Sequence, residues 1–275
     1  MTHLMEPALV NMPGASKDVH DKNCVFCKDA KAKGTESFIG ADNNPSTLET
    51  RLTAQRVPRR TFTHRKHGAF SSEPHHLMPG NEALKGHPVE KWLATRASGS
   101  EVEADTGFDI NSHFNGVWLP SVPVSFVGVS GWSWLDPDCQ QMAIDLMMTV
   151  CLQFHKGNHT NKGGLDRASS QPDRCYINMV EERLDDVVEH VDEWVDKFCP
   201  VAKKAKKKKR PPPFFLNDLL YRYVSAYMMK EVSGAPEKWK VFISRVAFAA
   251  SEKAKAKSKK RPRAASSSAS KRPRK

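Results

Sequence analysis

The stretch EPHHLMPG, residues 73 to 80, decides how the rest of the chain is interpreted. It predicts a short strand that ends at two adjacent histidines, just before a Pro-Gly turn. Adjacent side chains of a strand point to opposite faces, so His75 and His76 need different roles or a local bend. One imidazole can hold a metal ion while its neighbour takes a proton from water near neutral pH.

Two further stretches complete the pattern. GFDINSHFNGVWLP, residues 107 to 120, predicts a turn followed by a short apolar strand, and Asn115 at that turn is a candidate to orient a general base. In HKGNH, residues 155 to 159, the spacing of His155 and His159 places both imidazoles on one side of a helical turn, where they can chelate one divalent ion. The three stretches together indicate a hydrolytic metal centre for a phosphodiester.

The order His-His, Asn, His-x-x-x-His, followed by a tyrosine-containing helix, resembles the HNH/endonuclease VII superfamily and, more narrowly, the AHH-type toxin nucleases. The resemblance covers residues 70 to 195. Pro74 stands where these nucleases often have alanine, and residues 160 to 174 separate the tyrosine helix from His159. The resemblance implies an α+β, mostly helical fold with a ββα-metal (HNH) core and helical and loop-rich extensions.

The same resemblance assigns expected roles. His75, His155 and His159 correspond to the metal ligands, and His76 corresponds to the general base. Asn115 is expected to fix the ring orientation of His76. A set of three histidines does not dictate one ion, so Mg²⁺, Mn²⁺, Ni²⁺ and Zn²⁺ all stay open at the catalytic site.

The activity implied is that of a metal-dependent, sequence-nonspecific DNA endonuclease, acting as an antibacterial toxin effector of a type VI secretion or polymorphic toxin system. Expected partners are DNA, a cognate immunity protein and a secretion-system carrier. Such a toxin is made in the bacterial cytoplasm and injected into a target cell, where it acts in the cytoplasm. Two alternatives stay open: an RNase of the same fold, and a non-catalytic, zinc-stabilised nucleic-acid-binding protein.

The net charge of +12 comes from two basic runs. Residues 203–210 supply seven positive charges and residues 251–275 a net ten, which leaves −5 for the remainder. Both runs are expected to bind phosphate backbones without reading sequence. The candidates in the first run are Lys203, Lys204, Lys206, Lys207, Lys208, Lys209 and Arg210. The second run has no apolar face and is predicted to be disordered.

The cysteines suggest a second, structural metal site. Cys24 and Cys27 form a CxxC turn that can point two thiolates at one zinc ion, and Cys199 is the best third ligand. A histidine such as His20, His64 or His67 would be the fourth. The competing interpretation is an unpaired thiol turn in a reducing compartment.

Breaks in the pattern divide the chain into five parts. Residues 1–70 are predicted to be a loop-rich segment with the candidate zinc site, 71–200 the nuclease core, 201–213 a basic Pro-rich linker, 214–250 a helical extension and 251–275 the disordered tail. Helices are expected over 87–96, 138–154, 176–195, 214–231 and 236–250. No stretch approaches the roughly 20 apolar residues of a membrane span, and no signal peptide is evident, so no membrane partner is expected.

Overall fold

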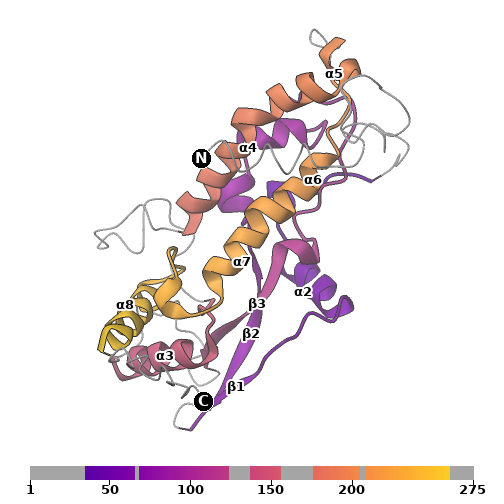
Figure 1. The fold of residues 1–275 in the computed structure, drawn as a ribbon. Helices are drawn as coiled ribbons and strands as arrows, with labels where there is room; N and C mark the ends of the chain where they lie inside the picture. Colours follow the sequence, from indigo (N-terminus) through magenta and orange to yellow (C-terminus); the bar gives the residue numbers. More distant parts are fainter. Residues whose placement is uncertain (1–34, 66–67, 124–136, 156–175, 205–208, 261–275) are drawn as a thin grey trace, which may run out of the picture.

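The computed structural model describes residues 35–65, 68–123, 137–155, 176–204 and 209–260 (Figure 1). Within these ranges, a small three-stranded antiparallel sheet is accompanied by seven α-helices. The chain is therefore mixed α+β, as predicted. In the same ranges, no helix combines the length and the apolar character that crossing a bilayer requires.

The sheet is built from β1 (Phe62–His64), β2 (Gly68–His76) and β3 (Gly116–Pro123), in the order β1-β2-β3. The register pairs His75 with Val117 and His76 with Gly116. Both strands predicted around the histidine pair and around Val117 are thus confirmed, and they are direct neighbours. The histidine pair consequently lies where β2 ends and β3 begins.

Helix α2 (Pro45–Ala54) packs against β2 and β3, in a part of the chain that was predicted to be loop-rich. Its start signals are present in the sequence. Asn44 caps the helix by accepting a hydrogen bond from Thr47 N at 3.1 Å, and Pro45 occupies the first turn. Leu48 and Leu52, four residues apart, are fully buried against Trp118 of β3. This contact holds α2 beside the end of β2.

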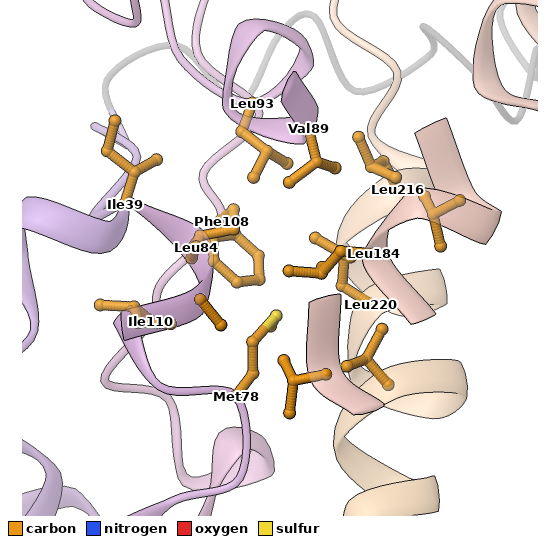
Figure 2. Close-up of a cluster of buried hydrophobic side chains, with 14 of the residues drawn as sticks. Ile39, Met78, Leu84, Val89, Leu93, Phe108, Ile110, Leu184, Leu216 and Leu220 are labelled. Carbon is orange, nitrogen blue, oxygen red and sulfur yellow. The ribbon is translucent and has the colours of Figure 1, made fainter. Parts of the chain in front are cut away.

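The main core lies between the loops that follow β2 and a pair of long helical segments (Figure 2). One is α4 (Tyr176–Phe198), confirmed as predicted by its apolar spacing. The other joins α6 (Phe215–Leu219), a π-helical segment (Leu220–Ser225) and α7 (Ala226–Val232), which matches the helix expected over 214–231. Figure 2 shows Leu184 of α4 and Leu220 facing Met78 and Phe108 across this core.

A second core joins α3 (Pro137–Val150) and α8 (Arg245–Lys260) to the far end of β2. Phe70 of β2 packs edge-on against Phe154, with ring centroids 5.4 Å apart. α3 ends before the predicted position, because Cys151 adopts a positive φ of 57° and residues 152–155 turn away from the helix. His155 therefore follows the helix instead of belonging to it.

The predicted helix over residues 87–96 is wrong except for a short 3-10 segment, Pro88–Trp92. Two of its carbonyl groups are bonded to distant residues: Lys91 O accepts from Glu101 N at 2.8 Å, and Leu93 O accepts from Thr106 N at 2.9 Å. These longer-range partners replace the i to i+4 bonds that an α-helix needs. Gly86, in the turn just before this segment, adopts a positive φ of 77°.

The helix predicted over residues 236–250 is wrong in its first half. Only Pro236–Lys238 forms a 3-10 turn, and the chain is then drawn out of helix by Gln153, which donates to Val241 O at 2.7 Å and accepts from Ile243 N at 2.9 Å. The tail is likewise not disordered from residue 251, because α8 continues to Lys260. Ala254 is buried and Lys253 pairs with Asp145 of α3, so the start of this basic stretch packs against the fold.

The segment predicted as a linker is partly helical and partly packed. α5 (Pro200–Lys204) follows α4 directly. Arg210 is only 7% exposed. Its guanidinium group pairs with Asp192 and lies 5.1 Å from the ring centroid of Trp92. Arg210 therefore uses its charge inside the fold, and its predicted contact with DNA stays a prediction.

Candidate active site

A pocket of about 370 Å³ lies at the end of β2, beside the first turn of α2. It brings together both histidines of the pair and His155, from the chain after α3. The described residues that line it are Asn43, Pro45, Ser46, Glu49, Glu73, Pro74, His75, His76, Pro79, Glu82 and His155. Three of these side chains are histidines, three are glutamates and none is lysine or arginine.

His75 is 2% exposed and contacts the first residue of α4. Its Nε2 lies 3.2 Å from the hydroxyl oxygen of Tyr176, and that hydroxyl donates its single hydrogen to Leu77 O at 2.7 Å. Tyr176 can therefore only accept from His75, which places the imidazole hydrogen on Nε2 and the lone pair on Nδ1. Burial raises the pKa of Tyr176 well above its ordinary value, so the hydroxyl keeps its hydrogen.

His155 is placed beside His75 by contacts with the sheet. Its backbone N–H donates to Pro120 O of β3 at 2.7 Å, and its Nδ1 lies 2.8 Å from Oε2 of Glu73 in β2. Because a carboxylate only accepts, Nδ1 carries the hydrogen and the lone pair of neutral His155 lies on Nε2. The rings of His75 and His155 meet edge to face, with centroids 5.2 Å apart.

His76 has a different set of partners from its neighbour. Its Nε2 lies 3.1 Å from Oδ1 of Asn111. The orientation of that amide is fixed, since Oδ1 also accepts from Asn44 N at 2.9 Å and Nδ2 donates to Asp42 O at 3.0 Å. His76 therefore donates through Nε2, and its basic lone pair lies on Nδ1.

The electrostatic surroundings keep His76 neutral. Burial lowers its pKa below the ordinary value of 6.5, the hydrogen bond to Asn111 raises it, and the nearby His155 lowers it again. A lowered pKa means that the ring is unprotonated at neutral pH. An imidazole in that state can accept a proton from water.

The role predicted for Asn115 belongs to Asn111. Asn115 is fully buried, and its amide is occupied by the main chain: Nδ2 donates to Met78 O at 3.0 Å and Ile110 O at 2.9 Å, while Oδ1 accepts from Met78 N at 2.9 Å. Ser225 also donates to its Oδ1 at 2.7 Å. Asn115 thus fixes the turn that follows His76, and Asn111, four residues earlier, holds the ring.

Two of the three predicted metal ligands, His75 and His155, are brought together. His159 lies outside the described residues. Among the residues that are described, no group of three or more His, Cys, Asp or Glu side chains is arranged closely enough to hold a metal ion. The donor chemistry nevertheless fits a divalent cation, because two oriented imidazoles share a pocket with three carboxylates.

Three residues of the site were not predicted from the sequence. Glu73 stands two residues before the histidine pair and therefore shares a face of β2 with His75. Asn111 lies in the same turn-forming stretch as Asn115, and Tyr176 opens the predicted tyrosine helix. Their positions were visible in the sequence, but their contacts depend on tertiary structure.

The structure describes only some residues of the other predicted sites. Cys24 and Cys27 lie outside the described residues, and Cys199 is buried where α4 meets α5, with its Sγ 3.5 Å from Ala202 N. Lys203, Lys204 and Lys209 are exposed. Lys206, Lys207 and Lys208 also lie outside the described part of the chain.

Comparisons of the chain with protein families, with curated proteins and with solved structures find no match.

Proposed function

We propose that this chain is a metal-dependent, sequence-nonspecific DNA endonuclease with a ββα-metal (HNH) core. The observation that carries the proposal is the meeting of His75, His76 and His155 at one pocket, where two antiparallel strands join. Each ring has a hydrogen-bond partner that selects one tautomer. Oriented imidazoles in two different chemical settings suit a hydrolytic centre better than a purely structural role.

The charge of the pocket supports a metal-dependent reaction. Glu49, Glu73 and Glu82 line it, and no described lining residue is a lysine or arginine. A phosphodiester is an anion and would be repelled by these carboxylates at short range. A divalent cation, when bound, would neutralise the phosphate and stabilise charge on the leaving oxygen. Nδ1 of His75 and Nε2 of His155 would hold it, with His159 as the expected third ligand.

His76 would act as the general base. A water molecule attacks phosphorus in line with the leaving oxygen, and its proton passes to Nδ1 of His76. The new P–O bond forms as the bond to the leaving oxygen breaks. The leaving oxygen then takes a proton from solvent, so the products are a phosphomonoester and a free hydroxyl. Asn111 keeps the accepting nitrogen in place through its bond to Nε2.

Purified full-length protein tests this activity on supercoiled plasmid DNA with Mg²⁺, Mn²⁺, Ni²⁺ or Zn²⁺ added singly. We expect nicking and linearisation with at least one ion, complete suppression by EDTA and fragments without sequence preference. A parallel digestion of RNA distinguishes the RNase alternative, because the same chemistry cleaves either polymer. Binding of both polymers with cleavage of neither, under all four ions, would support the non-catalytic alternative.

The biological setting proposed is that of an antibacterial toxin effector, with support from the sequence resemblance alone. Such an enzyme, injected into a target cell, requires an immunity protein in its producer, and a protein that covers the pocket would serve. Expression in the bacterial cytoplasm tests this setting. We expect loss of viability with the wild-type chain and normal growth with His76→Ala.

A further inference from the structure

The described residues contain a basic segment that neither lysine run includes. Residues 51–65, here called the arginine segment, contain five arginines and no aspartate or glutamate. The segment begins in α2, whose first turn lines the pocket, and ends just after β1. In Figure 1 this part of the chain runs from α2 alongside β2 to β1. It therefore leads away from the pocket along one edge of the sheet.

Two of its arginines hold the segment in place. Arg51 forms an ion pair with Asp109. Arg59 donates to Ser72 O of β2 at 2.9 Å and to Glu49 at 3.2 Å, and its guanidinium lies 4.4 Å from the ring centroid of Trp118. Because Glu49 lines the pocket, Arg59 fixes the segment at the edge of the candidate active site.

The other three arginines expose their charged groups to solvent. Arg56, Arg60 and Arg65 are exposed, and within the described part of the chain their guanidinium groups make no hydrogen bond or ion pair. Arg60 is tied to β2 only through its carbonyl, which accepts from Ser72 Oγ. Three uncompensated guanidinium groups on a held backbone form a surface suited to an anionic partner.

Positions along β2 show how far this surface extends from His75 in the pocket. Ser72, opposite Arg60, is three residues from His75, or about 10 Å. Arg65 follows His64, which pairs with Gly68, seven residues from His75 and so about 23 Å away. Duplex DNA advances about 3.4 Å per base pair, so this length spans roughly seven phosphates of one strand.

We propose that the arginine segment is the surface that binds the phosphate backbone of a nucleic acid and leads it to the pocket. Guanidinium groups pair with phosphate oxygens through two parallel hydrogen bonds and read no base. The guiding role rests on the proposed function, whereas backbone binding itself does not. Recognition of this kind matches a nuclease without sequence preference.

The exposed lysines of residues 203–209 are less well placed for this role. α4 begins at Tyr176, beside His75, and its 23 residues extend roughly 33 Å before α5 and these lysines. A duplex seated on the pocket would have to continue for about ten base pairs to reach them. The lysines can add distant contacts, while the arginine segment adjoins the pocket.

The test compares two triple variants with equal loss of charge. Arg56→Gln/Arg60→Gln/Arg65→Gln removes the exposed arginines, and Lys203→Gln/Lys204→Gln/Lys209→Gln is the matched control. Binding to a fluorescent 20-base-pair DNA duplex, and to an RNA duplex of the same length, is measured by anisotropy in EDTA at several salt concentrations. Circular dichroism verifies that each variant folds.

We expect the arginine variant to reduce the slope of log K against log salt on DNA by about 2.7, which is about 0.9 for each lost phosphate contact. Affinity at 0.05 M salt should fall by about a hundredfold or more, on RNA as well if the backbone is what is recognised. An unchanged slope in the folded arginine variant overturns the proposal, whatever the lysine variant does. The binding measurement is made in EDTA and does not depend on cleavage. If the wild type failed to cleave DNA in the separate assay with added metal, the proposed function would be wrong, but the binding result could still be interpreted.

Discussion

Oε2 of Glu73 lies 2.8 Å from Nδ1 of His155, although 82 positions separate the two residues in the chain. Glu73 belongs to β2, and the backbone of His155 is bonded to Pro120 of β3. Two adjacent strands thus orient a side chain that comes from beyond α3. A carboxylate that accepts from one imidazole nitrogen directs the lone pair of the other nitrogen and raises its basicity.

Glu73→Gln should weaken metal binding without unfolding the chain. The amide is a poorer acceptor than the carboxylate, so His155 loses its preference for a hydrogen on Nδ1. We expect a 10- to 100-fold lower affinity, the range typical for partners of metal-binding histidines, measured by calorimetric titration with Zn²⁺ or Ni²⁺. Glu82→Gln is the matched control, because it removes the same charge from the same pocket. Equal losses in both variants would show that charge alone matters.

Tyr176→Phe should release the tautomer of His75 and cost stability. The substitution keeps the ring but leaves Leu77 O without its 2.7 Å hydrogen bond, at a cost of about 1–3 kcal/mol in unfolding free energy. Nitrogen-15 NMR of histidine-labelled, metal-free protein reports the tautomer directly. His75 should carry hydrogen on Nε2 in the wild type and populate both forms in Tyr176→Phe. Tyr223→Phe is the control: it removes a hydroxyl that accepts from Arg183 and donates to Asp186, and it should leave the tautomer of His75 unchanged.

Asn111→Asp should move the pH dependence of cleavage. A carboxylate beside Nε2 stabilises the imidazolium and raises the pKa of His76, which burial lowers in the wild type. Because the base must be neutral, the acid limb of the kcat/KM profile should shift to higher pH. Asn217→Asp is a suitable control, since its amide bonds Thr106 O away from the pocket. A limb that stays in place would remove His76 from the role of base.

Stability should fall between pH 7.5 and pH 5.5. Burial lowers the pKa of both His76 and His87 below 6.5, although Asp185 partly offsets the effect at His87. The unfolded chain then binds protons more readily than the folded chain, so this contribution is complete above about pH 6.5 and is lost as the pH drops below it. Urea denaturation should give a lower midpoint at pH 5.5, with a smaller decrease in His87→Gln. A midpoint that rises on acidification would contradict this account.

Helices and strands were predicted correctly from the sequence where their pattern was local and repeated. The apolar residues of α4 recur at helical spacing, and the strands around His75 and Val117 are bounded by turn residues, so all three elements were found. α2 was missed despite its Asn44-Pro45 start, because it carries only two buried apolar residues. The short 3-10 turn at Pro88 and the chain around Gln153 depend on distant hydrogen bonds that no periodicity reveals.

The histidines of the candidate site could be predicted from the sequence, but the side chains that hydrogen-bond to them could not. The sequence placed His75, His76 and His155 in one group, and the pocket contains all three. It assigned the ring-orienting role to Asn115, whereas Asn111 contacts the ring and the amide of Asn115 is bonded to the main chain of Met78. The arginine segment was visible as a run without acidic residues, but its closeness to the pocket depends on how α2 meets β2.

The most direct test of the central claim is the rate of plasmid cleavage by His76→Ala, compared with His190→Ala, in the metal that best supports the wild type. His190 lies on α4 and stacks on Trp194, away from the pocket, so its loss controls for removal of an imidazole. Loss of a general base should lower the rate by about 10²- to 10⁴-fold in His76→Ala, while His190→Ala stays near the wild-type rate. Wild-type cleavage by a folded His76→Ala variant would contradict the account.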